Sequence, residues 1–236
     1  LIKFSGLKEG IHCFNYELGN KFFKNFDYYD FLDAKLLANL ELEKKFGYEG
    51  KTVIGYVGSL LAYEGLDLLL RAAAQLAKVR DDFRVLIVGS GVEHENLMEL
   101  AKKLGLGDIV HFTGRVPHSE VEQYYSLVDI APFPRLPIPV CEMVSPLKPF
   151  EAMAMEKACI VSSCAALTEI VQDEITGRVF DKGSYESLAA VITEMLDNPA
   201  QTQQYGKAGR TWVLENRTWS KNAVIVQQVY EKLLAK

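Results

Sequence analysis

The sequence lacks a long apolar segment. No run of about 18 or more apolar residues occurs in its 236 residues, so the sequence predicts no membrane-spanning helix. The opening residues, LIKFSGLKEG, lack the apolar core of a secretory signal peptide. We therefore expect a cytoplasmic protein. A peripheral position at the inner face of the membrane is the alternative, because residues 12–31 are rich in aromatic side chains.

Paired cysteine motifs are missing as well. The four cysteines form no Cys-x-x-Cys pair, and the four histidines show no metal-ligand spacing. We therefore expect a reducing compartment and no structural zinc site. The cysteines are Cys13, Cys141, Cys159 and Cys164.

Basic residues are also fewer than acidic ones, 26 against 31. The formal net charge is −5, and the sequence pI is about 5.5. This balance argues against nucleic acid as a partner, because nucleic acids are bound by basic surfaces. An anionic small molecule would have to be bound by a few local cations rather than by the field of the whole protein.

Several nucleotide and hydrolase motifs are absent. Gly89-Ser90-Gly91 begins like a dinucleotide fingerprint, but His94 stands where the third glycine belongs. The sequence contains neither the P-loop pattern Gly-x4-Gly-Lys-Ser/Thr nor the Gly-x-Ser-x-Gly of α/β-hydrolases. The sequence therefore does not favour an NAD-dependent enzyme, a P-loop NTPase or an α/β-hydrolase.

What the sequence does contain is a regular alternation of strand and helix patterns from Lys51 onward. Short apolar runs typical of buried strands alternate with amphipathic segments, which predicts a parallel sheet covered on both faces. We expect an α/β fold, a doubly wound Rossmann-like sheet with a helical C-terminal tail. The expected strands are residues 52–58, 84–88, 109–112, 128–133, 158–162 and 178–180. The expected helices are residues 64–79, 92–104, 119–126, one that begins near 147, 167–172, 185–196, 200–215 and 220–234.

One domain boundary is expected near residue 50. Residues 1–50 show no clean period apart from a helical pattern over 33–46, which Gly47 and Gly50 would end. We therefore treat residues 1–50 as an N-terminal segment and residues 51–236 as the ligand-binding domain.

The most informative stretch is residues 140–170, VCEMVSPLKPFEAMAMEKACIVSSCAALTEI. We expect a loop over residues 140–146, followed by a helix whose first turn holds Pro149. A helix that starts just after a strand end offers free N–H groups to a phosphate. Lys148 stands at that start and Glu151 follows one turn later, which suits a ligand with both phosphate and sugar hydroxyls. The alternative is an ordinary proline-rich turn with a surface lysine and a glutamate that complements the helix dipole.

Further candidates follow the ends of the expected strands. Backbone N–H groups of the turns at Gly58 and Gly89 could meet a phosphate, and Arg115 could stack on a base or pair with a phosphate. The alternatives are ordinary strand-to-helix turns and an isolated surface arginine. The candidate binding residues are Gly58, Ser59, Gly89, Arg115, Val116, Leu147 and Glu151.

Together these segments resemble the C-terminal domain of GT-B fold glycosyltransferases of family 4, group 1. The resemblance runs in order through VIGYVGSLLAYEGLDLLLRAAAQL, FRVLIVGSGVEHENLMELAKKLGL, IVHFTGRVPHSEVEQYYSLVDIAPFP, PLKPFEAMAMEKACIVSS and EIVQDEITGRVF, and covers roughly residues 50–236. It implies that this domain binds a nucleotide-sugar donor. A separate N-terminal domain would bind a carbohydrate or lipid-linked acceptor, and residues 1–50 would be a linker or a remnant of it.

The resemblance also implies roles for individual residues. Glu151 matches the second glutamate of the family's Glu-x7-Glu motif, which hydrogen-bonds the ribose hydroxyls. The first glutamate, which contacts the transferred sugar, corresponds to Met143, and the neighbouring Glu142 is the candidate to replace it. Glu142 and Lys148 are therefore the expected catalytic residues.

Two further positions depart from the family pattern. The family usually has an arginine and a lysine after the first strand, which neutralise the donor diphosphate, whereas this sequence has Ser59 and Glu64 there. A glutamate in the same geometry would repel a diphosphate. We therefore expect Lys148 to be the replacement cation.

The implied function is transfer of a sugar from a nucleotide-sugar with retention of configuration, in polysaccharide or glycolipid synthesis. No metal or cofactor is expected, since positioned cations and helix N–H groups can stabilise the leaving diphosphate. Some 50 residues cannot form a second Rossmann-like domain, so a missing N-terminal domain or a partner chain is expected to complete the enzyme. A non-catalytic nucleotide-sugar-binding module is the main alternative, and a sugar-nucleotide epimerase is a further one.

Overall fold

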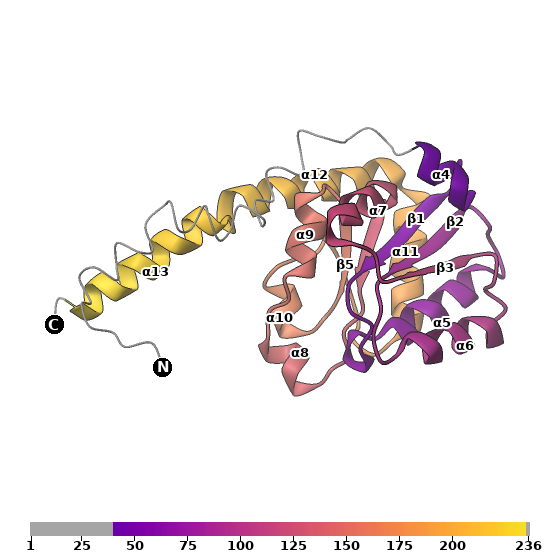
Figure 1. Cartoon of the computed structure of the whole chain (residues 1–236), viewed down its shortest axis with the longest axis horizontal. Helices are drawn as coiled ribbons and strands as arrows, with labels where there is room; N and C mark the ends of the chain where they lie inside the picture. The colour runs from indigo at the N-terminus through magenta and orange to yellow at the C-terminus, as the bar shows by residue number, and fades with distance from the viewer. Residues whose placement is uncertain (1–39, 235–236) are drawn as a thin grey trace.

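The computed structural model describes residues 40–234, and their centre is a six-stranded sheet with the order β3-β2-β1-β4-β5-β6 (Figure 1). Every pair of neighbouring strands is parallel. The predicted doubly wound Rossmann-like sheet is therefore confirmed, with the change of direction between β1 and β4, where such folds bind ligands. The strands are β1 (Thr52–Val57), β2 (Phe83–Val88), β3 (Val110–Gly114), β4 (Ile130–Phe133), β5 (Ala158–Ser162) and β6 (Gly177–Phe180).

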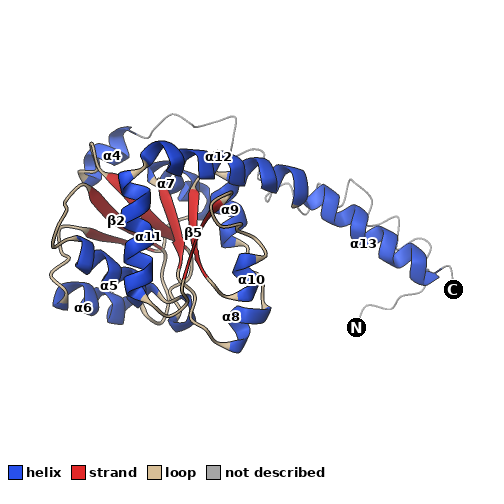
Figure 2. Cartoon of the chain, turned by 180° about the vertical axis from the view of Figure 1, so that it is seen from behind, coloured by secondary structure: helices blue, strands red, loops and turns tan. Residues whose placement is uncertain are grey.

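Helices cover both faces of this sheet. On one face α5 (Leu66–Leu76) packs beside α11 (Tyr185–Asp197) (Figure 2). On the opposite face lie α7 (Val121–Leu127) and α9 (Lys148–Ala154). The other helices are α4 (Leu40–Phe46), η2 (Ala62–Glu64), α6 (His94–Lys103), η3 (His118–Glu120), α8 (Pro139–Met143), α10 (Ala165–Thr168), α12 (Pro199–Asn216) and α13 (Trp219–Leu234).

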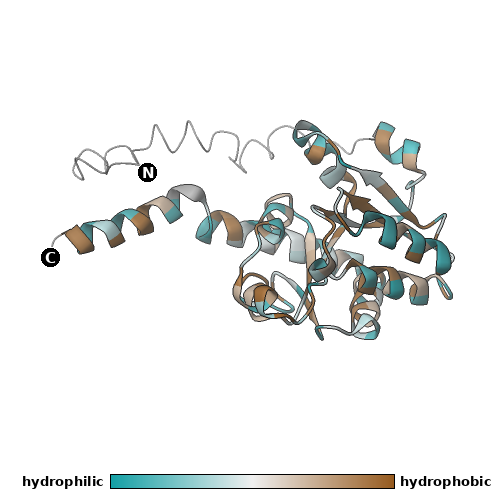
Figure 3. Cartoon of the chain, turned by 60° about the horizontal axis from the view of Figure 1, so that its bottom comes forward, coloured by the Kyte–Doolittle hydropathy of each residue, from teal (hydrophilic) through white to brown (hydrophobic). Residues whose placement is uncertain are grey.

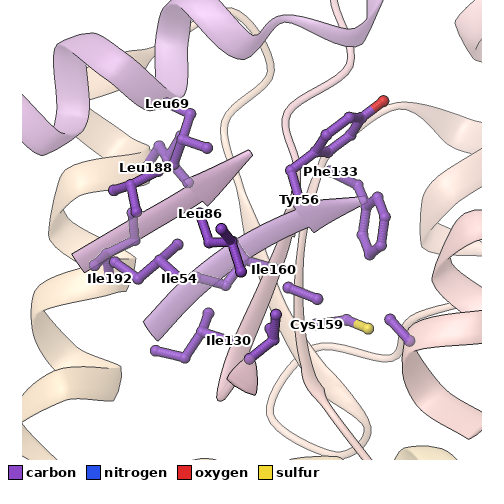
Figure 4. Packing of buried hydrophobic residues seen from close by; sticks show 14 of the residues in the cluster. Ile54, Tyr56, Leu69, Leu86, Ile130, Phe133, Cys159, Ile160, Leu188 and Ile192 are labelled. Carbon is purple, nitrogen blue, oxygen red and sulfur yellow. The ribbon is translucent and has the colours of Figure 1, made fainter. Parts of the chain in front are cut away.

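The core joins the central strands to the covering helices. Leu69 of α5 lies close to Leu188 of α11 beside the strands (Figure 4), and both side chains are fully buried. Tyr56 of β1 lies near Phe133 of β4, with ring centroids 6.4 Å apart. Burying one large apolar side chain contributes about 1.5–3 kcal/mol to folding. This packing therefore fixes the carboxyl ends of β1 and β4, where the candidate site lies.

α4 is attached to the sheet by aromatic contacts. The Tyr48 hydroxyl lies 2.9 Å from Nδ1 of His111 in β3, and the rings of Phe46 and Tyr48 stack with centroids 5.4 Å apart. The helix predicted over residues 33–46 is described from Leu40 onward. The aromatic segment 12–31 lies outside the described residues.

α13 extends away from the domain in both views (Figures 1 and 2). Apolar and polar segments alternate along it (Figure 3). Within residues 40–234, no helix combines the length and apolar character needed to cross a membrane. The exposed large apolar side chains of α13 are Val224, Ile225, Val226, Val229, Tyr230, Leu233 and Leu234.

Several element boundaries differ from the predictions. The helix predicted over residues 167–172 is instead α10, at Ala165–Thr168. The prediction of a loop over residues 140–146 was wrong in part, because α8 occupies the first half of that range. Pro139 in the first turn of α8 presets the helical φ, and the Val144 N–H bonds the Val140 carbonyl. The helix predicted from Glu64 begins instead at Leu66, since Gly65 adopts a φ of +70° that interrupts it.

The close packing of one side chain against the backbone of β1 makes the core sensitive to one glycine. A methyl group on Gly55 of β1 would lie 2.1 Å from the Val128 side chain. Gly55→Ala is therefore expected to lower the free energy of unfolding by about 1–3 kcal/mol through overpacking, measured by urea denaturation. Gly107→Ala is the matched control, because a methyl there meets no atom within 4 Å. Equal stability of the two variants would contradict this packing.

Candidate functional site

A pocket of about 350 Å³ opens at the carboxyl ends of β1, β2 and β3. This edge lies beside the change of direction in the sheet, where open α/β folds bind ligands. The structure brings together here five of the residues predicted from the sequence. The lining residues are Val57, Gly58, Ser59, Val88, Gly89, Ser90, Arg115, Val116 and Val121.

Two glycines let the walls of this pocket come together. Gly58 and Gly89 adopt φ values of +151° and +134°, which other residues rarely adopt. A methyl on Gly89 would lie 1.9 Å from the Gly58 carbonyl oxygen, and one on Gly58 would lie 2.5 Å from Cε of Lys148. Lys148 therefore lies against the Gly58 wall of the pocket although it comes from α9.

Lys148 is held by two polar partners. Its ammonium donates to Oε1 of Glu64 at 2.6 Å and to the Tyr56 hydroxyl at 2.7 Å. The Tyr56 hydroxyl in turn donates to the Ser59 carbonyl at 3.0 Å. Burial lowers the pKa of Lys148, while the Glu64 carboxylate opposes that change. Burial, followed by the Glu64 charge, raises the pKa of Tyr56, so its phenol stays protonated.

Glu64 does not face a ligand as an unpaired charge. Its side chain is 2% exposed, and Arg135, which follows β4, contacts it from a second side with Nη2 3.3 Å from Oε1. Repulsion of a diphosphate was expected only of a glutamate in the family's geometry, and Glu64 is instead buried between two cations. Two cations neutralise this carboxylate, because desolvated charges are stable only when they are paired.

Arg135 was not identified from the sequence as a candidate site residue. It is 8% exposed, and Nη1 donates to the Val144 carbonyl at 3.1 Å. An arginine two residues after the expected strand 128–133 was a visible signal. Its partner Glu64 is 71 residues away in the sequence, so the pairing itself was not visible.

Glu151 lies three residues after Lys148 in the first part of α9 and is half-buried. Burial raises its pKa, whereas the charges of Lys148 and His118 and the Tyr125 hydroxyl lower it. Leu147, at the position before α9, is 50% exposed. The pocket lining does not include Leu147, Lys148 or Glu151.

Glu142 points toward α10 in this structure. Its Oε2 accepts the Ala165 N–H at 2.8 Å, and its Oε1 lies 2.6 Å from Nζ of Lys182. Hydrogen bonds from Lys182 and from Ala165 lower the pKa of Glu142. The neighbouring Met143 is 75% exposed. Glu142 is therefore a carboxylate held at the start of α10, outside the lining of the pocket.

A second cavity is a weaker candidate for a binding site. A cavity of about 420 Å³ adjoins Arg178 at β6, but this arginine is paired with Asp173 and Glu194. Among residues 40–234, no three side chains of the metal-binding types cluster closely enough to hold an ion.

The buried ion cluster is expected to matter for stability. Glu64→Ala would leave Lys148 and Arg135 without their shared counter-charge and is expected to cost about 3–5 kcal/mol. Glu99→Ala is the control, since its pair with Lys103 is 72–74% exposed and should contribute about 0.5 kcal/mol or less. Chemical denaturation of both variants measures the difference. Similar losses would contradict the buried pairing.

Comparison with known proteins bears on this geometry. The family model of the glycosyl transferases group 1 matches residues 39–212. A GDP-mannose-dependent α-(1-6)-phosphatidylinositol monomannoside mannosyltransferase of Mycolicibacterium smegmatis is 26% identical over 188 residues, which are 77% of this chain and 48% of the relative. The 2-deoxystreptamine glucosyltransferase of Streptomyces kanamyceticus is 28% identical, over 83% of this chain and 50% of its own.

Solved structures agree with this relation. Sucrose-phosphate synthase from Thermosynechococcus elongatus matches with a TM-score of 0.72 and 27% identity, over 83% of this chain and 49% of its own. Anabaena HepE, solved with UDP-glucose, matches with a TM-score of 0.69 over 83% of this chain and 51% of its own, and at 18% identity it supports the fold alone. The chain spans about half the length of the relatives it matches. From the family match and the shared sheet, the chain belongs to the group 1 glycosyl transferases.

Proposed function

We propose that this chain is the donor-binding half of a glycosyltransferase. The enzyme would transfer the sugar of a nucleoside diphosphate sugar to an acceptor with retention of configuration. The observation that carries the proposal is the juxtaposition of the glycine-walled pocket with Lys148. The turns at Gly58 and Gly89 line the pocket, and the ammonium of Lys148 lies against the Gly58 wall. The N–H groups of these two glycines donate to the carbonyls of Val88 and Gly114, so Lys148 is the group that we propose stabilises the negative charge of a phosphate.

The remaining candidate residues receive roles under this proposal. Arg115 and Val116 line the pocket and contact the base, and Glu151 accepts hydrogen bonds from the ribose hydroxyls. Glu142 keeps its proposed role toward the transferred sugar. Its carboxylate can accept hydrogen bonds beyond those from Ala165 and Lys182, because an ionised carboxylate has about four lone-pair sites.

The proposed reaction is balanced without a protein nucleophile. The bond between the anomeric carbon and the diphosphate oxygen breaks, and a bond from the acceptor oxygen to that carbon forms. The acceptor proton passes to an oxygen of the leaving diphosphate. Lys148 stabilises the charge that develops on this leaving group, and the proposed step uses no metal.

The acceptor is proposed to be a carbohydrate or a lipid-linked sugar in polysaccharide or glycolipid synthesis. The name of one relative supports this range, since it acts on a phosphatidylinositol mannoside, whereas another acts on the aminocyclitol 2-deoxystreptamine. We propose that a second domain or partner chain holds the acceptor. The exposed apolar side chains of α13 are one surface that such a partner could cover.

The first test is calorimetric titration of the chain with UDP-, GDP- and ADP-sugars. We expect saturable binding of donors with one of the three bases. Glu151→Ala should weaken that binding about tenfold to hundredfold, because a hydrogen bond to a charged group contributes about 1.5–3 kcal/mol. Glu99→Ala on α6 should leave it unchanged. Absence of binding to all three classes would contradict the proposal.

Metal independence is tested in the same titration. Addition of excess EDTA is expected to leave the donor affinity unchanged, because Lys148 supplies the positive charge. Added Mg²⁺ should have no effect beyond that of ionic strength. A loss of affinity with EDTA that Mg²⁺ restores would show that the site needs a metal.

A further inference from the structure

Arg135 is a buried cation to which the proposed function assigns no role. It lies two residues after the end of β4, is 8% exposed, and places its guanidinium 5.6 Å from the Tyr63 ring centroid. Nε lies 3.4 Å from Oε2 of Glu64 and Nη2 lies 3.3 Å from Oε1. Burying a guanidinium is costly, so its partners indicate what it stabilises.

Glu64 connects Arg135 to Lys148. The oxygen that accepts from the Lys148 ammonium at 2.6 Å is the same Oε1 that Nη2 of Arg135 approaches at 3.3 Å. One carboxylate (−1) against two cations (+2) leaves the cluster with a net charge of +1. Without Arg135, the Glu64–Lys148 pair would be neutral, and this cluster would add no net positive charge to that of Arg115 in the pocket lining.

A second contact of Arg135 fixes the chain that carries Lys148. Nη1 donates to the Val144 carbonyl at 3.1 Å, four residues before Lys148. The Ser162 hydroxyl, at the end of β5, donates to the Arg135 carbonyl at 2.8 Å. The backbone of Arg135 is therefore anchored to the sheet, and its guanidinium holds the segment that leads into α9.

We infer that Arg135 is a positioning residue of the donor site, which keeps the charge of Lys148 available to a diphosphate by neutralising Glu64 and by holding the segment before α9. This inference rests on the proposed function. Arg135 itself is too buried to touch the ligand, so it acts through Glu64 and Lys148. Electrostatic interactions of partly buried charges are screened less than those at the surface.

The test follows the net charge of the cluster in the full 236-residue chain. Arg135→Gln changes the cluster from +1 to 0, and the double variant Glu64→Gln/Arg135→Gln returns it to +1. Arg135→Lys retains the charge without the planar fork. Lys103→Gln is the control, because it removes one exposed charge from the last turn of α6.

Two ligands separate charge from general structure. UDP, GDP and ADP carry the diphosphate, whereas uridine, guanosine and adenosine carry only the base and ribose. The diphosphate that binds wild type best is titrated by calorimetry, and its nucleoside is followed by ligand-observed NMR. Circular dichroism melts report whether each variant is folded.

We expect Arg135→Gln to weaken diphosphate binding about tenfold and to leave nucleoside binding unchanged. The double variant should regain affinity to within a few-fold of wild type, and Arg135→Lys should lie closer to wild type than Arg135→Gln. Lys103→Gln should match wild type. A merely structural role predicts that both ligands weaken together and that the double variant is the weakest.

Each remaining outcome has a defined meaning. If Arg135→Gln does not fold, the double variant and Arg135→Lys decide the question, and failure of both to bind diphosphate overturns the inference. If wild type and Arg135→Gln bind the diphosphate equally, the inference fails while the proposed function stands. If wild type binds no nucleoside diphosphate at all, the proposed function itself fails.

Discussion

A buried carboxylate shared by two cations is the interaction on which the candidate site depends. Glu64 lies between Lys148 and Arg135, and its side chain is 2% exposed. Removing Glu64 would leave two desolvated cations without their shared counter-charge, which is costly in a protein interior. The cluster therefore ties together the turn after β1, the end of β4 and the start of α9. These three segments meet at the edge of the sheet where the pocket opens.

The parallel sheet makes this meeting possible. β1 and β4 are neighbours although the chain between them forms β2 and β3, so residues far apart in sequence converge at one edge. Gly58 and Gly89 let the ends of β1 and β2 approach so closely that a methyl on Gly89 would lie 1.9 Å from the Gly58 carbonyl. The same edge carries the ammonium of Lys148, the cation of the proposed diphosphate site.

The departures from the family pattern become coherent in this geometry. A lysine is usual where this chain has Glu64, and here the cation comes from Lys148 on α9 while the carboxylate holds it in place. A positive charge therefore lies against the pocket wall, although it comes from a different element. Glu142, the proposed replacement for the family's glutamate at Met143, lies outside the pocket lining and contacts Ala165 and Lys182. The phosphate side of the proposed site is thus better supported than its sugar side.

The sequence by itself determined the sheet, because apolar runs and amphipathic periods act locally and depend little on distant residues. It also identified Gly58, Gly89 and Arg115 as residues at strand ends, and the structure places all three in one pocket. Tertiary structure alone decided the partners of Glu64, since Lys148 and Arg135 lie 84 and 71 residues away in the chain. It also decided that Glu142 faces Lys182 and that a short helix occupies part of the expected loop. Side-chain pairing across a sheet edge depends on strand order and burial, and a single sequence contains no local pattern that specifies either.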